Sequence, residues 1–362
     1  MKLDDLRNRL NELDRQLIEL IAERQSVVEQ VGELKRSTGT ATRDYAREKR
    51  VLDRARENAE LLGIAPDIAE DVMRLLIRTS LTRQERARVS AEGQGSGRLA
   101  LVIGGGGKMG RWFAEFLDSQ GYTVTIADPF NAVAQFACVP DWKDAGNDFA
   151  VTVVAAPLKA SATILNEMVA TGHQGLVFDV GSLKTPLIPA LRNLAASGAL
   201  VTSVHPMFGP DTDLLSDKHV IFLDAGSDEA KHAAQALFGP TMARLTSMKL
   251  EEHDRLIAYV LGLSHAVNIA FFSVLARSGE SVPRLEHISS TTFDAQLEVA
   301  SKVAAENPQL YFEIQSLNEF GSEPLEALID AIQSIADSVR DNDEAAFVKL
   351  MEDGRRYLDS RA

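Results

Sequence analysis

The chain has 362 residues, of which 45% are hydrophobic and 25% charged, and its formal net charge is −14. This length predicts two or three globular domains, and the negative charge disfavours nucleic-acid binding, which selects basic surfaces. The only cysteine, Cys138, excludes an internal disulfide and a cysteine metal cluster, which fits a cytoplasmic location. We expect neither a signal peptide nor a membrane span, because the N-terminus is charged and no run of about 18 apolar residues is present.

Residues 1–89 predict an all-α module. Apolar residues recur at helical spacing from Leu3 to Val31, and Pro66 suits the first turn of a later helix. The first helix would be about 50 Å long. That length is also typical of a coiled-coil dimerisation module, so the polar positions must decide between the two. The expected helices run to about residue 36, from about 45 to 62, and from Pro66 to about Arg88.

The next stretch, SAEGQGSGR at residues 90–98, predicts a flexible linker. Residues 99–245 then alternate short β-branched runs with helical stretches, which is the βαβ pattern of a parallel, doubly wound sheet. Residues 246–362 predict an all-α C-terminal domain that begins with one long apolar helix. The β-branched runs are LALVIGGGG, YTVTIADP, FAVTVVAAP, GLVFDVGS, LVTSVHP and HVIFLDAG.

A glycine-rich turn follows the first of these strands and precedes a helix. Its G-x-G-x-x-G frame suits a tight turn, the close approach of a pyrophosphate and close helix–strand packing, and predicts a Rossmann-type dinucleotide-binding domain. Asp128 ends the second strand, where an acid binds the adenine ribose hydroxyl and repels a 2′-phosphate. We therefore expect NAD rather than NADP, although Lys108 could tolerate a phosphate. The predicted cofactor-binding residues are Gly105, Gly107, Lys108, Met109, Gly110 and Asp128.

With these features together, the chain resembles the bifunctional chorismate mutase–prephenate dehydrogenase family, the T-proteins of tyrosine biosynthesis. The N-terminal part resembles the all-helical mutase class, and the remainder resembles prephenate dehydrogenases with a C-terminal dimerisation domain. The resemblance covers nearly the whole chain. It rests on LRNRLNELDRQLIELIAER, VGELK, RDYAREK and LLIRTSLTRQ in the first part, and on GGGGKMGRWF, DVGSLK, HPMFGPD, EEHD and NPQLY in the second.

The resemblance implies a mutase site that folds chorismate into a chair-like conformer and stabilises charge on its ether oxygen. Lys35 and Gln84 would address the ether oxygen, and Glu48 would take the ring hydroxyl. Arg24 and Lys35 share one helix face whereas Arg7 does not, so Arg7 would serve the partner subunit of a homodimer. The alternative is that these charged residues form a solvated helix face without a catalytic role. The implied positions are Arg7, Arg24, Lys35, Asp44, Arg47, Glu48, Ser80 and Gln84.

In the second half, His205 follows the strand run LVTSV, and ligands of open parallel sheets bind at the carboxyl ends of the strands. An imidazole titrates near working pH, and the resemblance makes His205 the catalytic group at the C4 hydroxyl of prephenate. Ser182 could touch the same hydroxyl, and Lys184 could serve cofactor or substrate. Tyr311 of NPQLY is implied as a substrate-binding residue.

The other histidines have less certain roles in the sequence. His265 either faces the substrate or is a satisfied core histidine, with both interpretations open. We expect His253 to orient its charged surroundings and His173 to lie in a turn or on the surface.

One position departs from the family pattern. Counting without gaps from NPQLY places Asp294 where prephenate dehydrogenases carry a substrate-clamping arginine. Three explanations stay open. Another cation, such as Arg255, Arg284 or Lys302, supplies the clamp. Alternatively, the substrate carries an ammonium group, as arogenate and the 4-amino-4-deoxy analogues do, and Asp294 pairs with it. In the third, dehydrogenase activity is weak or lost.

The leading hypothesis is therefore a bifunctional enzyme with NAD as cofactor, acting on small molecules and not on nucleic acid or membranes. A rival from another class is a non-catalytic regulatory dimer, which the full set of mutase polar positions argues against. A generic NAD-dependent dehydrogenase with a helical oligomerisation module is a third possibility.

Overall fold

The computed structural model describes residues 2–360, so the outermost residues of the two predicted terminal domains lie outside it. The chain divides into two compact units. The first contains the chain up to Ala156 together with Thr163–Gly181 and Ala190–Met248, and the second contains Pro157–Ala162, Ser182–Pro189 and the chain from Lys249 onward. The N-terminal helices and most of the sheet domain therefore share one unit.

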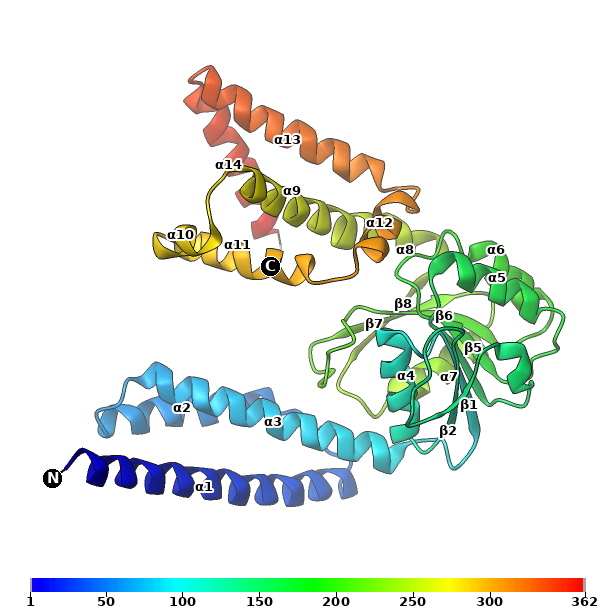
Figure 1. Cartoon of the computed structure of the whole chain (residues 1–362), viewed down its shortest axis with the longest axis horizontal. Helices are drawn as coiled ribbons and strands as arrows, with labels where there is room; N and C mark the ends of the chain where they lie inside the picture. The colour runs from blue at the N-terminus through cyan, green and yellow to red at the C-terminus, as the bar shows by residue number, and fades with distance from the viewer. Residues whose placement is uncertain (1, 361–362) are drawn as a thin grey trace. The chain divides into compact units, whose positions relative to one another are not determined.

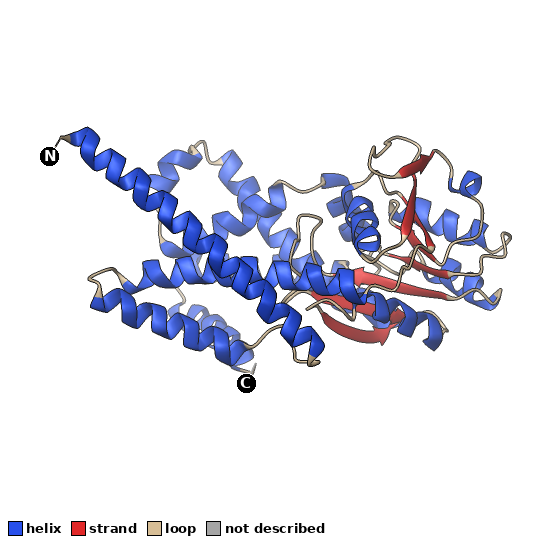
Figure 2. Ribbon diagram, turned by 90° about the horizontal axis from the view of Figure 1, so that it is seen from below, coloured by secondary structure: helices blue, strands red, loops and turns tan. Residues whose placement is uncertain are grey.

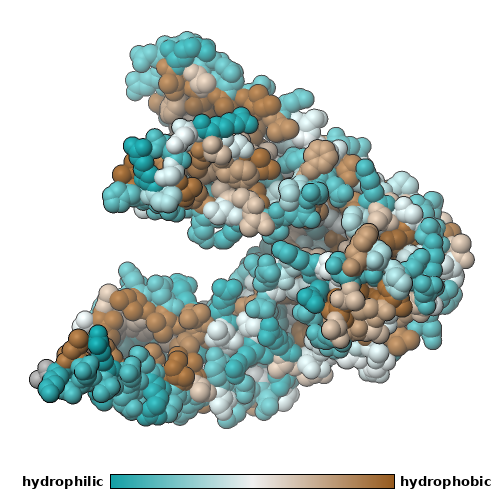
Figure 3. Space-filling view, viewed as in Figure 1, coloured by the Kyte–Doolittle hydropathy of each residue, from teal (hydrophilic) through white to brown (hydrophobic). Residues whose placement is uncertain are grey.

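Three helices open the chain, as the periodicity predicts: α1 (Leu3–Ser37), α2 (Tyr45–Leu61) and α3 (Pro66–Glu92). The length of α1 is clear in Figure 2. Helix α2 packs along α3, and α1 approaches α3 where Gly32 faces Gln84. Other apolar side chains of α1 stay exposed, including Leu3, Leu10 and Leu17 at 62%, 58% and 53%. These helices therefore leave a large apolar surface uncovered within the described chain (Figure 3).

The segment after α3 is held in place rather than free, which corrects the expectation of a flexible linker. Helix α3 continues to Glu92, and the backbone N–H groups of Gly95 and Gly97 donate to the carbonyls of Gln120 and Gly121 at 2.9 and 2.8 Å. A Cβ built on Gly95 would lie 2.2 Å from the Gly121 backbone, so only glycine fits there. Backbone contacts thus join the end of the N-terminal helices to the sheet domain.

The sheet has eight strands in the order β3-β2-β1-β4-β5-β6-β7-β8. Strands β1, β2, β5, β6, β7 and β8 are labelled in Figure 1. The pairs from β3 to β6 are parallel, but β7 is antiparallel to β6, with His205 opposite Ile221. The expectation of an all-parallel sheet was wrong here. The connection between β6 and β7 contains no helix, so it makes no crossover and the chain returns antiparallel.

Two strands, the three-residue β3 and the six-residue β8, were not expected from the sequence. The strands are β1 (Leu99–Ile103), β2 (Thr123–Ala127), β3 (Ala137–Val139), β4 (Val151–Val154), β5 (Leu176–Asp179), β6 (Val201–Pro206), β7 (His219–Asp224) and β8 (Arg244–Lys249). Between them lie α4 (Lys108–Ser119), the 3-10 helix η1 (Trp142–Ala145), α5 (Leu158–Met168), α6 (Ile188–Ala196) and α7 (Asp228–Phe238).

The core of this unit is aromatic. Phe113 and Phe116 of α4 meet Phe238 of α7 with ring centroids 6.3 and 5.0 Å apart, and Phe222 of β7 lies 5.7 Å from the same ring. Val89 of α3 joins this cluster and is 5% exposed. Such burial is the main favourable term in folding, and here it includes the last turns of the N-terminal helices.

The second unit is helical beyond Lys249, as expected. Its predicted long apolar helix contains a π-helical segment, a distortion often found at functional sites. The continuous stretch Leu250–Arg277 is long and apolar enough to cross a membrane by length and composition alone, which corrects the expectation that no such stretch exists. This is weak support for a span, because core helices of soluble proteins meet the same test. The helices are α8 (Leu250–Ile257), η2 (Ala258–Leu263), α9 (Ser264–Arg277), α10 (Val282–His287), α11 (Thr291–Ala304), α12 (Pro308–Ser316), α13 (Ser322–Arg340) and α14 (Glu344–Asp359).

Candidate active sites

Two of the predicted mutase residues are in direct contact between α1 and α3. The Nη1 of Arg24 donates to Ser80 Oγ at 2.8 Å and to the Leu76 carbonyl at 3.2 Å. Arg24 is half-buried and Ser80 is 5% exposed. Burial lowers the pKa of the Arg24 guanidinium, but not into a range where an arginine loses its charge. The pair thus places a fixed cation beside a hydroxyl, as binding of a carboxylate requires.

Lys35 and Gln84 lie further along the same two helices. The Lys35 ammonium donates to the Thr42 carbonyl at 2.6 Å, and Gln84 Nε2 donates to the Val28 carbonyl at 3.3 Å. The Oε1 of Gln84 is buried and accepts no hydrogen bond from the described residues. Gln84 therefore keeps unsatisfied polar capacity in a buried place, which suits a ligand-binding group.

Three further predicted mutase residues, Asp44, Arg47 and Glu48, lie at the N-cap and in the first turn of α2. Asp44 caps the helix by accepting the Arg47 N–H at 2.8 Å, and Arg47 itself is exposed. Glu48 is half-buried and receives both Nε and Nη2 of Arg43, at 2.9 and 3.1 Å. Sequence reasoning missed Arg43, although it precedes Asp44 directly in the motif RDYAREK.

Arg7 is not brought to the other mutase residues. Its side chain is 66% exposed and lies 3.6 Å from Asp4. It precedes Arg24 by 17 residues on one continuous helix, which is about 25 Å. Within one described chain Arg7 therefore has no route to Arg24.

The glycine-rich turn follows β1 and leads into α4, as predicted. The left-handed conformation of the turn is at Gly104, with φ 82°, and not at Gly105, the first glycine of the G-x-G-x-x-G frame. Gly105 is needed for a different reason, since a Cβ there would lie 2.7 Å from Ile126. A Cβ at Gly110 would lie 2.2 Å from the Gly104 carbonyl oxygen, so α4 packs against the turn as predicted.

The N-terminus of α4 fits a dinucleotide phosphate. Gly107 is its N-cap, and no side chain caps the helix, which leaves its first N–H groups for an anion. Lys108 is exposed beside it, whereas Met109 packs against the hydrophobic core. Asp128 accepts the Gly106 N–H at 3.0 Å and the Phe130 and Asn131 N–H groups at 2.9 Å. The acid is thereby fixed at the carboxyl end of β2, beside the turn.

His205 is the penultimate residue of β6 and is only 3% exposed. Strands β1, β2, β4, β5 and β6 are parallel, so His205, the glycine-rich turn and Asp128 share one edge of the sheet. The sequence-based placement of His205 at this edge is therefore what the sheet shows. His173 was expected in a turn or on the surface, but it is 4% exposed, with Nε2 2.8 Å from Thr152 Oγ1.

In the second unit, the loop that carries Ser182 and Lys184 is anchored by Asp254 of the EEHD motif. The Lys184 N–H donates to the two Asp254 oxygens at 2.9 and 3.0 Å, and the Thr185 N–H donates to Oδ2 at 2.6 Å. His253 Nδ1 lies 2.6 Å from Asp254 Oδ1. Although burial alone would raise it, these hydrogen bonds lower the pKa of Asp254 overall. His253 thus orients a buried acid, and Asp254 is a site-building residue that sequence reasoning missed.

His265 and Tyr311 meet in the same unit. Their rings stack with centroids 4.1 Å apart and an interplanar angle of 25°. Burial lowers the pKa of His265 and raises that of Tyr311, so both are neutral near pH 7. His265 Nδ1 is buried and has no hydrogen-bond partner among the described residues. His265 is therefore not a core histidine with all its polar atoms hydrogen-bonded within the described residues.

Asp294 has a local structural role. It lies exposed in the first turn of α11, accepts a hydrogen bond from Ser289 Oγ, and follows the N-cap Ser290. An acid in the first turn stabilises a helix, so its presence there needs no ammonium-bearing ligand. Of the other proposed clamps, Arg284 pairs with Glu280 and Lys302 with Glu298, both at the surface.

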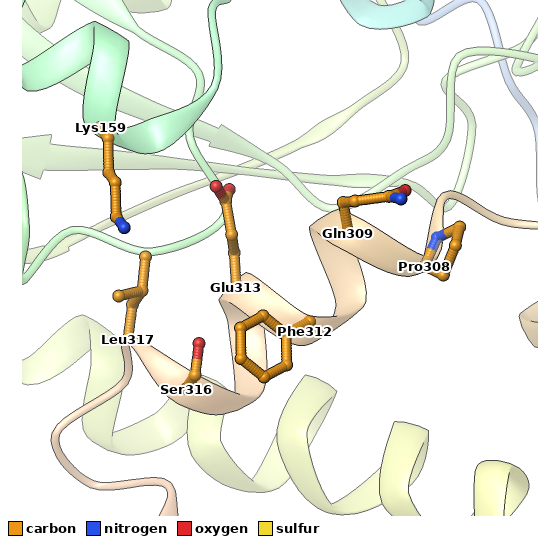
Figure 4. Close-up of a pocket in the computed structure, with 7 residues that line it drawn as sticks. All are labelled: Lys159, Pro308, Gln309, Phe312, Glu313, Ser316 and Leu317. Carbon is orange, nitrogen blue, oxygen red and sulfur yellow. The ribbon is translucent and has the colours of Figure 1, made fainter.

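A cavity of about 400 Å³ lies beside α12 in the second unit (Figure 4). Lys159 and Glu313 bring opposite charges to it, and Tyr311 of the same helix is not among its lining residues. The cavity is lined by Lys159, Pro308, Gln309, Phe312, Glu313, Ser316 and Leu317. Pro308 and Gln309 belong to the NPQLY motif, but none of the predicted site residues lines the cavity.

Comparison with known families gives three matches in chain order. They are chorismate mutase type II over residues 6–85, the nucleotide-binding domain of prephenate dehydrogenase over 122–245, and its dimerization domain over 249–353. A T-protein of Enterobacter agglomerans is 29% identical over 316 residues, covering 86% of this chain and 81% of the relative. A chorismate mutase of Methanocaldococcus jannaschii is 31% identical over 85 residues, covering 24% of this chain and 86% of the relative. The chain belongs to the bifunctional chorismate mutase–prephenate dehydrogenase family.

These matches confirm the family and the fold class expected from the sequence. The fold is also that of a solved A. aeolicus prephenate dehydrogenase in complex with hydroxyphenyl propionate and NAD+, with a TM-score of 0.56. That structure is 20% identical and covers 72% of this chain and 98% of its own. The glycine-rich turn precedes the nucleotide-binding match, so its assignment in this chain rests on the turn geometry described above.

Proposed function

We propose that this protein rearranges chorismate to prephenate in its N-terminal helices and then oxidatively decarboxylates prephenate to 4-hydroxyphenylpyruvate with NAD. The observation that carries the proposal is the order of the three family matches on one chain, together with relatives that match across both halves. Both products lie on the route to tyrosine.

In the mutase site, Arg24 with Ser80 holds a substrate carboxylate, supported by their direct hydrogen bond. Lys35 and Gln84 stabilise the charge that develops on the ether oxygen as its C–O bond breaks. Glu48 accepts the ring hydroxyl, and Arg47 and Asp44 complete the site at the start of α2. The reaction is unimolecular, so positioning and charge supply the catalysis.

In the dehydrogenase site, bound NAD supplies the acceptor for the hydride that leaves C4. His205 accepts the proton of the C4 hydroxyl, and the electron pair of the C–CO₂ bond enters the ring as CO₂ leaves. The N-terminus of α4 binds the pyrophosphate, with Gly107 and Gly110 keeping the approach open and Asp128 binding the ribose hydroxyl. Lys108 and Met109 flank that phosphate site.

The second unit supplies substrate-binding groups. Asp254 holds the loop that carries Ser182 and Lys184 through the Lys184 N–H, and the stacked pair of His265 and Tyr311 offers a buried ring nitrogen to a substrate oxygen. Asp294 stays a predicted substrate-binding position, though its exposure and its bond to Ser289 do not favour a direct role.

We propose a homodimer in the cytoplasm, with Arg7 reaching the mutase site of the partner subunit. The exposed leucines of α1 and the match to a dimerization domain support association. Substrates bearing an amine at C4 are not favoured, because the T-protein relatives cover both halves and Asp294 has a local explanation. A non-catalytic regulatory dimer is not favoured either, since both enzyme families match.

One assay panel with a matched variant tests the proposal. Chorismate loss and NADH formation are followed separately with chorismate, prephenate, arogenate and the 4-amino analogues as substrates. We expect His205→Asn to lower prephenate turnover by about 10²- to 10⁴-fold and to leave chorismate loss unchanged. Turnover of a 4-amino substrate but not of prephenate would overturn the proposed substrate, and His205→Asn with full activity would overturn the proposed role of His205.

A further inference from the structure

Arg43 connects the mutase carboxylate Glu48 to the sheet domain. Its Nε and Nη2 hold the two oxygens of Glu48 at 2.9 and 3.1 Å, a bidentate arrangement that fixes the orientation of the carboxylate. Its remaining nitrogen, Nη1, donates to Ser216 Oγ and Asp217 Oδ2. Ser216 and Asp217 belong to residues 207–218, which join β6 to β7 and which we call the β6–β7 loop.

Several contacts in addition to those with Glu48 and Ser216 fix the position of the Arg43 side chain and of Asp217. The guanidinium lies 4.2 Å from the ring centroid of Tyr45, and Tyr45 Oη donates to Asp217 Oδ1 at 3.1 Å. Arg244 of β8 lies 3.2 Å from the same oxygen. The hydrogen bond from Arg43 is the largest of the contacts that lower the pKa of Asp217. The Arg43 and Glu48 side chains are only 20% and 19% exposed, so this is not an isolated surface ion pair.

The β6–β7 loop is also fixed to α3. Glu85, next to the predicted catalytic Gln84, accepts the Leu215 N–H at 2.8 Å and the Met242 N–H at 2.5 Å. Glu85 is 4% exposed. At the surface, Arg86 of α3 pairs with Asp213 of the loop at 2.9 Å. The loop therefore has a defined position beside the mutase helices from which Asp217 can hold Arg43.

We propose that Asp217 is a positioning residue for the mutase reaction, acting through Arg43 to orient Glu48. The inference rests on the proposed mutase function and assigns part of the mutase machinery to the dehydrogenase half of the chain. Glu48 sits in the first turn of a helix whose neighbouring side chains are exposed, so without Arg43 its carboxylate has several rotamers available. Asp217 and Ser216 hold the guanidinium in the orientation that presents its other edge to Glu48.

The test compares Asp217→Asn with Asp213→Asn in the full-length protein. Asp217 has a φ of 63°, a conformation that asparagine tolerates, so the substitution removes the charge without straining the backbone. We expect Asp217→Asn to lower the kcat for chorismate by about tenfold to a hundredfold, with a smaller change in KM. Asp213→Asn removes an ion pair from the same loop that does not touch Arg43, so it should leave kcat unchanged.

A double-mutant cycle separates positioning from a structural effect. If Asp217 acts through Glu48, Asp217→Asn costs nothing further in the Glu48→Gln background, measured at high enzyme concentration. An equal loss in both backgrounds, or a kcat for Asp217→Asn equal to the wild-type value, would overturn the inference while the proposed function stands. Absence of mutase activity in the wild-type protein would overturn the proposed function and this inference with it. The melting temperatures of Asp217→Asn and Asp213→Asn, measured together, show whether a loss of kcat follows a loss of fold.

Discussion

At the scale of single residues, a buried histidine makes the free energy of unfolding depend on pH, independently of catalysis. Burial lowers the pKa of His173, whose ring is 4% exposed and lies against Thr152 in β4. Its Nδ1 has no partner among the described residues, so a protonated ring has nothing to donate to on that side. The neutral form is therefore the one that the fold accommodates.

This gives a stability prediction with a definite sign. The folded pKa of His173 lies below its unfolded value of about 6.5, so its contribution is complete above that value. It is lost as the pH falls through the folded pKa, because the unfolded state then binds more protons. We expect the free energy of unfolding to fall below pH 6.5, by up to about 1.4 kcal/mol per pH unit from this group.

Thermal unfolding of wild type and His173→Gln between pH 5 and 8 checks this. The variant should show a shallower loss of melting temperature on acidification, although His265, whose pKa is lowered in the same way, keeps part of the slope. Thr152→Val is the control, because it removes the hydrogen bond but keeps the titrating ring. Parallel curves for wild type and His173→Gln would show that His173 is not the group responsible.

Residues whose role depends on a strand end or a motif were predictable, and residues whose role depends on a distant partner were not. The positions of His205 and Asp128 at one edge of the sheet were predictable, because His205 lies at the end of β6 and Asp128 directly follows β2. Glu85 and Asp254 accept backbone N–H groups about 130 and 70 residues away, and nothing in the local sequence encodes such a partner. Arg43 is of this second kind, since its distant partners lie more than 170 residues further along the chain.

At the scale of elements, the turn between β1 and α4 combines a binding role with a packing role. The two can be separated, because a Cβ at Gly110 would lie 2.2 Å from the Gly104 carbonyl oxygen whereas one at Gly107 would lie 3.3 Å from it. Gly107 has a φ of −75°, which alanine adopts without strain. An added methyl group would therefore clash at Gly110 but fit at Gly107, although both glycines belong to one motif.

We expect Gly110→Ala to displace the turn, lowering stability by about 1–3 kcal/mol and weakening NAD binding together. Gly107→Ala should lower stability by less than about 1 kcal/mol, because the weaker N-cap is partly offset by the smaller backbone entropy of alanine at this φ, and it should still weaken NAD binding. Calorimetric titration with NAD and thermal unfolding of both variants check this. Equal losses of stability in the two variants would contradict the separation.

The sheet shows why element order is easier to predict than direction. The β-branched run of β7 has the composition of a parallel strand, but direction depends on the connection. Residues 207–218 make hydrogen bonds to α3 and α4 instead of forming a helix, including one from Trp112 Nε1 to the Thr212 carbonyl at 3.0 Å. Those partners lie far away in sequence, so the antiparallel return of β7 could not be foreseen.

At the scale of the whole molecule, the exposed apolar face of α1 and the isolation of Arg7 have one common explanation. An unpartnered stripe of leucines favours association with a second copy, and a C₂ dimer brings the same helix across each site. The mutase site would then require two chains, which makes it testable by complementation.

Arg7→Ala and Arg24→Ala should each lose most mutase activity. Co-expressed, they form mixed dimers in which one site carries both substitutions and the other carries neither, so about a quarter of wild-type activity should return. The control is Lys35→Ala mixed with Arg24→Ala. Both residues are predicted to serve the site of their own subunit, so each site of a mixed dimer carries one lesion and no activity should return. A mixture of Arg7→Ala and Arg24→Ala that stays inactive would show that Arg7 does not serve the partner subunit.

The glycine-containing segment after α3, residues 93–97, limits how the N-terminal helices and the sheet domain can be separated. Gly93 and Gly95 touch the backbone at Gln120 and Gly121 so closely that no side chain fits, and Val89 is buried in the core of the sheet domain. A cut after residue 89 would separate Val89 from the following core residues of the sheet domain and leave that core partly uncovered, so a separately expressed sheet domain would be expected to aggregate. An insertion in this segment should therefore be tolerated only if Gly93 and Gly95 keep their close backbone contacts with Gln120 and Gly121.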